Sequence, residues 1–161
     1  HPLSFEEVAK MCTGKVKMMI DTKPRNPCYG YYKRMGDIMD KYGLLDGAYF
    51  INHEPREYFW GRAKFHFRMT DIPEMMKKLA NGEDVACHYF LFDNGNRLSS
   101  TAIKWCQKNY IQVVPSVNYT HYRNIENHWH GAKRDIEFLK ECGVVEYQID
   151  SHYDQWLPWM E

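Results

Sequence analysis

Short apolar segments alternate with helical patterns along most of this sequence. This alternation constrains the fold more than any other feature of the sequence. Six segments have the apolar, largely β-branched and aromatic composition of buried strands: 16–20, 48–51, 63–68, 85–92, 111–117 and 144–149. Parallel strands need long crossover connections, which are usually helices. Near-continuous apolar strands also suit a sheet that is covered on both faces. The sequence therefore predicts an α/β fold with about six parallel strands.

Helical patterns fill the intervals between these segments. Ser4 and Glu7 fit a capping box at the start of a helix that runs to about residue 12. Apolar residues recur at helical spacing between 29 and 42, and Gly43 marks the end of that helix. Further helical segments are expected just after 55, from 70 or 71 to 80, over 98–109 and over most of 119–142. This order is typical of repeated β/α units.

Length and charge narrow the class of protein further. With 161 residues the chain has the size of one domain with a substantial core, and we expect a single domain over 1–161. Lys plus Arg and Asp plus Glu each total 21, so no net charge attracts nucleic acid or an anionic membrane, and we expect no nucleic-acid partner. No apolar run approaches the roughly 20 residues of a membrane-spanning helix, so no transmembrane segment is expected.

The cysteine spacing bears on the redox state of the thiols, and the first residues bear on the processing of the chain. The five cysteines are odd in number and show no Cys-x-x-Cys spacing, so we expect reduced, mostly buried thiols rather than disulfides or a zinc site. The chain begins His1-Pro2-Leu3, without an initiator Met or a signal segment. We expect a mature product or a fragment, and the sequence assigns it no compartment.

Polar residues follow several predicted strands. Because strand side chains alternate between faces, Asp21 and Lys23 leave the first strand side by side, which suits an anionic ligand. The alternative is an ordinary surface salt bridge. Other polar residues at or just after strand ends are Asn52, His53, Arg68, Asp93, Asn118 and Asp150. In parallel sheets and (β/α) barrels, ligands bind at the carboxyl ends of the strands.

Four local motifs follow one another along the chain. They are 2–7 (Pro-Leu-Ser-Phe-Glu-Glu), 19–23 (Met-Ile-Asp-Thr-Lys), 113–118 (Val-Val-Pro-Ser-Val-Asn) and 142–150 (Cys-Gly-Val-Val-Glu-Tyr-Gln-Ile-Asp). In order and spacing they resemble the glycerophosphodiester phosphodiesterases, a family of phosphatidylinositol-phospholipase-C-like barrels. That family has Pro-x-Leu-Glu-Glu, Ile-Glu-x-Lys, Val-x-x-Trp-Thr-Val-Asn and Gly-Val-Asp-Gly-Ile-Ile-Thr-Asp at the corresponding places. Asp21 stands where the family has Glu, and Pro115 where it has Trp.

The resemblance implies an eight-stranded (β/α) barrel of the TIM type, present here only in part. A complete barrel typically needs about 250 residues, and this chain has 161. The family's His-Arg pair, its Glu-x-Asp metal pair and its second His precede the helix at which this sequence begins. We therefore expect a missing N-terminal segment or another chain to complete the barrel.

The resemblance also implies a reaction, the metal-dependent hydrolysis of a small phosphodiester. Asp21 would be one ligand of a divalent cation, Mg or Ca, for which oxygen ligands are suited. Lys23 would be catalytic, its charge placed against a phosphate oxygen as negative charge builds up. His53, Arg68 and Asn118 are further candidates for substrate binding. Because the family's acid/base histidines lie outside this sequence, we expect the isolated chain to be inactive.

Two other interpretations stay open. The barrel could be a degenerate, non-catalytic one that binds a sugar, polyol or lipid headgroup at its strand ends. The matches could also be coincidental, in which case a complete α/β domain with a closed six-stranded sheet is expected.

Several of these polar residues also have a purely structural reading. His53 could be a capping or surface residue, and Arg68 could pair with Asp71. Asn118 is expected to shape its loop, and Asp150 to have a structural hydrogen-bonding role.

The remaining histidines are expected to be structural. His88 lies within the predicted strand 85–92, so we expect a core histidine. His121, His128 and His130 suggest a metal cluster at first sight, but His128 and His130 would lie nearly on opposite sides of a helix. We therefore expect a solvated surface there.

Overall fold

The computed structural model describes residues 2–23, 28–52 and 56–156 of the chain. These residues belong to two compact units. The first comprises His1–His66 and Cys87–Tyr89, and the second comprises Phe67–Ala86 and Phe90–Glu161. Each unit is described by itself, and the expected single domain over 1–161 stays a prediction.

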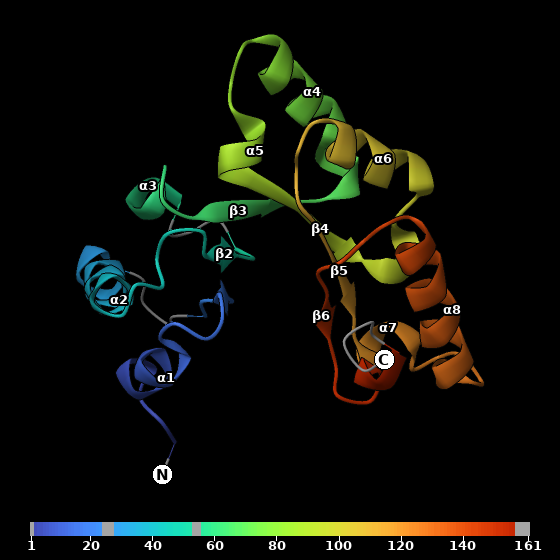
Figure 1. Ribbon diagram of the computed structural model, residues 1–161, viewed down its shortest axis with the longest axis horizontal. Helices are drawn as coiled ribbons and strands as arrows, with labels where there is room; N and C mark the ends of the chain where they lie inside the picture. Colours follow the sequence, from blue (N-terminus) through green and yellow to red (C-terminus); the bar gives the residue numbers. More distant parts are fainter. Residues whose placement is uncertain (1, 24–27, 53–55, 157–161) are drawn as a thin grey trace. The chain divides into compact units, whose positions relative to one another are not determined.

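The first unit is built on three short parallel strands. β1 (Met19–Ile20) pairs with β2 (Tyr49–Phe50), which pairs with β3 (Lys64–Phe67). The helices α1 (Phe5–Cys12), α2 (Tyr29–Lys41) and α3 (Arg56–Phe59) lie along one side of these strands (Figure 1). The ring of Phe50 stacks between those of Phe59 and Phe65, at centroid distances of 4.8 and 5.6 Å. This aromatic stack forms the centre of the unit's core.

Local sequence signals explain two of these helices. At the start of α1, the Ser4 hydroxyl accepts the Glu7 N–H at 3.3 Å, and the Glu7 carboxylate accepts the Ser4 N–H at 2.7 Å. The predicted capping box is therefore confirmed. In α2 the predicted apolar stripe is buried through Tyr32, Met35 and Met39, and the chain turns after the helix at Gly43, which has a φ of 65°.

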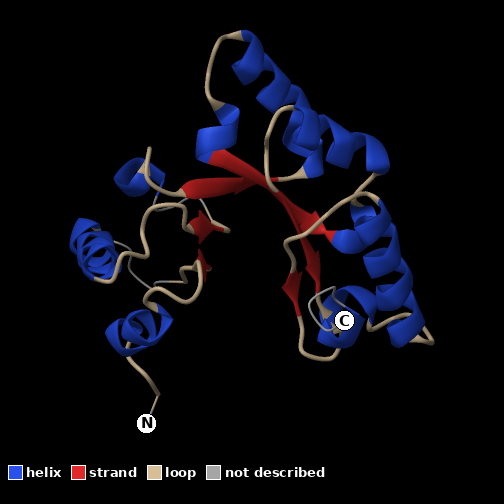
Figure 2. Cartoon of the chain, in the orientation of Figure 1, coloured by secondary structure: helices blue, strands red, loops and turns tan. Residues whose placement is uncertain are grey.

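The second unit repeats the strand and helix alternation. Its strands are β4 (Tyr89–Asn94), β5 (Val113–Val117) and β6 (Gln148–Ile149), paired in parallel. The longer helices α6 (Ser100–Lys108) and α8 (His128–Glu141) lie along one side of the strands (Figure 2). The remaining elements are η1 (Met69–Asp71), α4 (Ile72–Ala80), α5 (Val85–His88), η2 (Gly95–Arg97), α7 (Tyr119–Tyr122) and η3 (Asp154–Trp156).

Within each unit the strands follow one another in the sheet as they do in the chain, from β1 to β3 in the first unit and from β4 to β6 in the second. This sequential order is that of a (β/α) barrel, since doubly wound sheets reverse direction at a switch point. The predicted α/β class with six parallel strands is confirmed. β1 is paired by β2 alone and β6 by β5 alone within the described residues.

Several predicted strand bounds were wrong, although every predicted strand exists. The first strand was expected over 16–20 but begins at Met19, and Val16 is 57% exposed. The last was expected over 144–149 but spans only Gln148–Ile149. Residues 85–88 form the helical turn α5 instead of the start of β4. A strand requires a hydrogen-bonded neighbour, and apolar composition does not show where that pairing begins.

Candidate functional site

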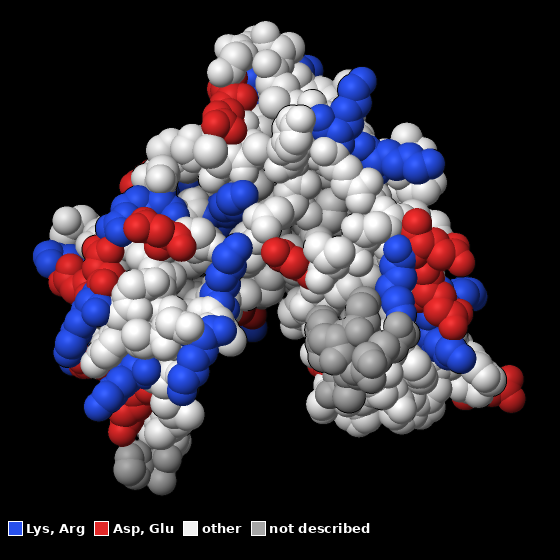
Figure 3. Space-filling view, viewed as in Figure 1, with Lys and Arg blue, Asp and Glu red and all other residues white. Residues whose placement is uncertain are grey.

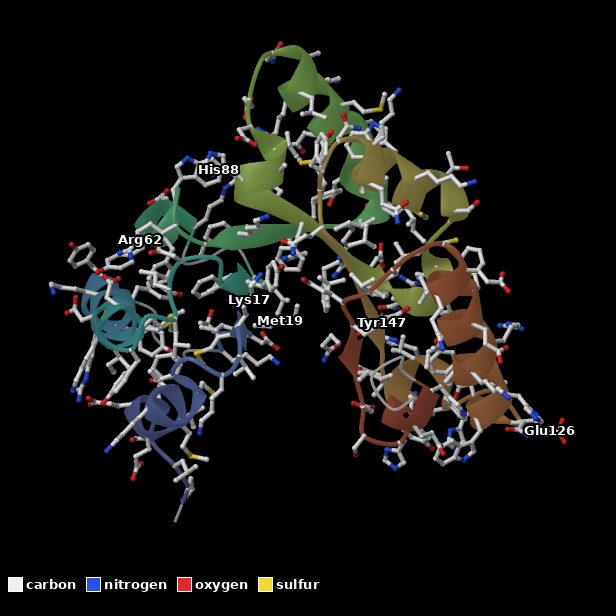
Figure 4. All side chains as sticks on the ribbon, in the orientation of Figure 1. Lys17, Met19, Arg62, His88, Glu126 and Tyr147 are labelled. Atoms are coloured by element: carbon white, nitrogen blue, oxygen red, sulfur yellow. The ribbon has the colours of Figure 1, made fainter. Side chains whose placement is uncertain are left out.

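The loop after β1 carries the first two candidate residues. Thr22 is buried, whereas Asp21 and Lys23 on either side of it are exposed, as strand alternation predicts. The Lys23 ammonium donates a hydrogen bond to the Asp21 carboxylate, and the two side chains are 80% and 38% exposed. Lys17 and Met19, labelled in Figure 4, lead into this loop. The structure thus brings Asp21 and Lys23 together as an ion pair.

Asn52, just after β2, holds the loop in place. Its Nδ2 donates to the Thr22 carbonyl oxygen at 2.9 Å and also to the Thr22 hydroxyl. Its Oδ1 accepts the Thr22 N–H at 3.4 Å. Because both the side chain and the backbone of Thr22 are bound inward, the side chains of Asp21 and Lys23 are directed the other way.

A pocket of about 470 Å³ opens beside this loop, between α1 and α2. Asp21 and Lys23 line it together with Arg34 of α2 and Glu6 of α1. Glu6 is already paired with Lys41 at 2.7 Å, and this ion pair lowers the pKa of the Glu6 carboxyl. Arg34 makes no hydrogen bond or ion pair with any described residue. The charge of Arg34 also lowers the pKa of the Glu6 carboxyl, as the smallest of the effects on that group, so the pocket contains a guanidinium that acts on Glu6 without a hydrogen bond or ion pair to a described residue.

A larger groove of about 930 Å³ lies between α2 and α3. Its cation, Arg62, binds Asp40 through two nitrogens at 2.6 and 2.9 Å and Asp46 through a third at 2.8 Å (Figure 4). Basic and acidic side chains are likewise interspersed over the visible face of each unit (Figure 3). The charge of Arg62 is satisfied, so this groove is less suited to an anion than the pocket beside β1.

The other predicted site residues have separate places. His53 lies outside the described residues. Arg68 follows β3 and is exposed, and the Asp71 carboxylate accepts its backbone N–H at 2.8 Å instead of pairing with the guanidinium. Asn118 precedes α7, and its Nδ2 donates to the Gln148 side-chain oxygen at 3.0 Å. Both Arg68 and Asn118 belong to the second unit, and their role in substrate binding stays a prediction.

His121, which the sequence analysis assigned to a solvated surface, is half-buried at the end of a strand. Its Nδ1 lies 3.1 Å from the Ser116 carbonyl oxygen, at the carboxyl end of β5. Burial lowers the pKa of the imidazole and the charge of Arg97 lowers it further, against the hydrogen bond to Ser116 and the charges of Asp150 and Asp93. The signal was its spacing of three residues after the strand-end Asn118, which places it on the first turn of α7.

The expectation of a solvated histidine surface was wrong for two of three residues. His121 and His128 are half-buried, and the Nδ1 of His128 lies 2.9 Å from the Tyr153 hydroxyl. His130 is exposed as expected. Asp150 has the structural role expected of it, since its carboxylate accepts the Tyr119 N–H at 2.6 Å.

Two further expectations need correction. His88 ends the short helix α5 and stacks on Trp60 at a centroid distance of 4.2 Å, so it lies neither in a strand nor in the deep core (Figure 4). The cysteines are all free, as expected, but only Cys106 is fully buried, and burial raises its thiol pKa to about 12. Cys28 and Cys87 are exposed, because neither position belongs to an inward-facing stripe.

The described residues do not by themselves form a cation site. The Asp21 carboxylate is bound by Lys23, and no group of three His, Cys, Asp or Glu side chains in the described part of the chain could hold a metal ion. Asp21 offers one oxygen ligand, whereas Mg and Ca take about six or more. Likewise, no described helix has the length and apolar character needed to cross a membrane.

No model of a known protein family matches the sequence, and no curated protein sequence matches it. Among solved structures, the chain is similar to the crystal structure of a glycerophosphoryl diester phosphodiesterase from Parabacteroides distasonis ATCC 8503. The TM-score is 0.61, the sequence identity is 10%, and the similarity covers 91% of this chain and 51% of that one. The chain thus spans about half the length of this neighbour. The fold is that of an incomplete TIM-type barrel, as the motifs predicted.

Proposed function

We propose that the pocket beside β1 binds the phosphoryl group of a small phosphoester. The chain would be the later part of a barrel of the glycerophosphodiester phosphodiesterase type, and the whole would hydrolyse a phosphodiester. The single observation that carries the proposal is that the Arg34 guanidinium, which has no ion pair with any described residue, lines the same pocket as Lys23. The structural neighbour and the motif at 19–23 support the same class of ligand.

The charges of the pocket favour a dianionic ligand. Arg34 presents a planar fork of donors that matches two oxygens of a phosphate, and Lys23 adds a mobile point charge. Lys23 forms an exposed ion pair with Asp21. A phosphate that lies between the two cations would draw Lys23 away from the Asp21 carboxylate. Breaking this ion pair costs little free energy, because exposed ion pairs contribute little stability.

Hydrolysis needs more than these residues supply. A divalent cation, Mg or Ca, with Asp21 as one ligand stays a proposal, since no group of three His, Cys, Asp or Glu side chains among the described residues could hold a metal ion. The family's acid/base histidines also precede the motif at which this sequence begins. We therefore expect these 161 residues to bind phosphoesters without turning over glycerophosphodiesters.

Calorimetric titration with glycerol 3-phosphate tests the proposal. Arg34→Gln and Lys23→Gln should each weaken binding about tenfold, because a hydrogen bond to a charged group contributes about 1.5 kcal/mol. Lys17→Gln removes an exposed charge outside the pocket and is the matched control. Unchanged affinity in Arg34→Gln would contradict the proposal, and metal-dependent hydrolysis by the unmodified chain would contradict the expected inactivity.

A second candidate function is binding without hydrolysis, as in a degenerate barrel. The ion pair between Asp21 and Lys23 favours it, because that pair occupies the one carboxylate proposed as a metal ligand. Added Mg or Ca distinguishes the two functions. If glycerol 3-phosphate affinity rises with the cation, the cation takes part in the site, and if it does not, the non-catalytic function is supported.

A further inference from the structure

Beyond its charged rim, the pocket beside β1 is lined by apolar side chains. They come from three elements: Phe5 of α1, Ile20 of β1, and Tyr31, Met35 and Ile38 of α2. Ile20 and Met35 are buried, whereas Phe5 and Ile38 are half-buried. The wall next to the two cations is therefore largely apolar and partly open to solvent.

The cation and the apolar wall share one helix face. Tyr31, Met35 and Ile38 are spaced by four and three residues, so they form a stripe along α2, and Arg34 lies beside it. A ligand that has its phosphate at Arg34 can therefore extend along this stripe. The pocket volume of about 470 Å³ is within the range of small-molecule sites.

A small polar diester would contact the two cations but leave the apolar side chains of the pocket without a matching partner. Glycerol places hydroxyl groups where Phe5, Met35 and Ile38 offer no hydrogen-bond partner. An alkyl or acyl chain would instead cover the apolar side chains, and burial of apolar surface is favourable in proportion to its area. The combination of two cations and an apolar stripe is thus complementary to an amphipathic anion.

We propose that the ligand of this pocket is a single-chain, amphipathic phosphoester. Its phosphate lies against Lys23 and Arg34, and its chain lies along Phe5, Met35 and Ile38. This inference rests on the proposed function, from which it takes the position of the phosphate, and it adds the class of substrate.

A homologous series of alkyl phosphates, from methyl to hexyl, tests the proposal below the micelle concentration of each compound. The headgroup stays constant, so any gain along the series measures the chain. Phosphorus NMR titration should show affinity rising about two- to fourfold for each added methylene until the stripe is covered.

Two variants assign the gain to this pocket. Lys23→Gln should weaken every member of the series about equally and leave the chain-length dependence unchanged. Ile38→Asn should flatten the dependence of affinity on chain length, and urea unfolding reports whether the variant is folded. Ile125→Asn makes the same substitution at an isoleucine of the second unit that is 43% exposed, and it should leave the dependence on chain length as it is in the unmodified chain.

The outcomes separate this inference from the function on which it rests. Equal affinity for methyl and hexyl phosphate, with Lys23→Gln still weakening both, overturns the amphipathic ligand and leaves the phosphate site intact. A chain-length dependence that survives in Ile38→Asn also overturns it, because the chain would then bind elsewhere. Failure of all members to bind overturns the proposed function itself.

Discussion

At the scale of single residues, His121 shows how the surroundings of a side chain change its pKa. His121 has its Nδ1 3.1 Å from the Ser116 carbonyl oxygen and 3.5 Å from the Asn118 backbone nitrogen, so Nδ1 donates to Ser116 in one neutral tautomer and accepts from Asn118 in the other. Burial disfavours the charged form of the ring, and Arg97 adds to that effect, so the imidazole is neutral at neutral pH.

We expect the imidazole of His121 to titrate below the ordinary histidine pKa of about 6.5. Because its folded pKa is lowered, its contribution to stability is present above the unfolded pKa and is lost as pH falls through the folded pKa. NMR titration of the ring protons measures the pKa directly. His121→Gln should lose less stability between neutral and mildly acid pH than the unmodified chain, as measured by urea unfolding.

The exposed His130 provides the control for this titration. His130→Gln should leave the pH dependence of urea unfolding as it is in the unmodified chain. A His121 ring that titrates at or above the ordinary value would show that Asp93 and Asp150 outweigh burial.

At the scale of elements, α2 contains two glycines in different surroundings. A Cβ on Gly30 would have the Cys28 sulfur, 4.0 Å away, as its nearest neighbour. A Cβ on Gly36 would lie 3.0 Å from ring carbons of Tyr58 and Phe59 in α3. Glycine at position 36 thus allows α2 and α3 to approach closely.

Alanine substitutions in α2 should therefore have opposite effects. Gly30→Ala gains helix propensity in open space and should raise the free energy of unfolding by up to about 1 kcal/mol. Gly36→Ala gains the same propensity but displaces the half-buried ring of Tyr58 and the buried ring of Phe59, which costs about 1–3 kcal/mol, so it should be net destabilising by about 1 kcal/mol. Chemical denaturation of the pair measures both, and stabilisation by Gly36→Ala would contradict the packing of α3.

The elements that local sequence determines were predicted well. The capping box joins Ser4 and Glu7, which are three residues apart. The buried apolar stripe of Tyr32, Met35 and Met39 in α2 follows from helical spacing alone. The misplaced strand at 85–88 shows the limit, because apolar residues of a short helical turn look like those of a strand.

At the scale of the whole molecule, positive and negative charges balance. The formal net charge is zero at pH 7, with a calculated isoelectric point near 7.2. Electrostatic repulsion between copies is therefore weakest near neutral pH.

We expect the chain to be least soluble close to pH 7. Solubility should rise in mildly acid solution, where the 8 histidines add positive charge, and again in alkaline solution. Light scattering across this pH range measures the association. A scattering minimum at neutral pH would show that surface features other than net charge control solubility.

The candidate site was predictable in part. Strand alternation alone placed Asp21 and Lys23 together, whereas the phosphoester role that the resemblance at 19–23 implies for them stays a prediction. The sequence reasoning missed Arg34, because its place in the pocket depends on the packing of α1 against α2. Its position between Tyr31 and Ile38 on one helix face was the signal that could have found it.

Asn52 determines where the loop after β1 lies, although it is 30 residues from Thr22 and does not line the pocket. A survey of substitutions restricted to pocket-lining positions would therefore omit Asn52, although its hydrogen bonds to Thr22 determine the direction of the Asp21 and Lys23 side chains. For the same reason, two related chains with identical pocket residues but different residues at 52 would present different sites to the same ligand. The geometry of the candidate site thus depends in part on a residue that follows the neighbouring strand.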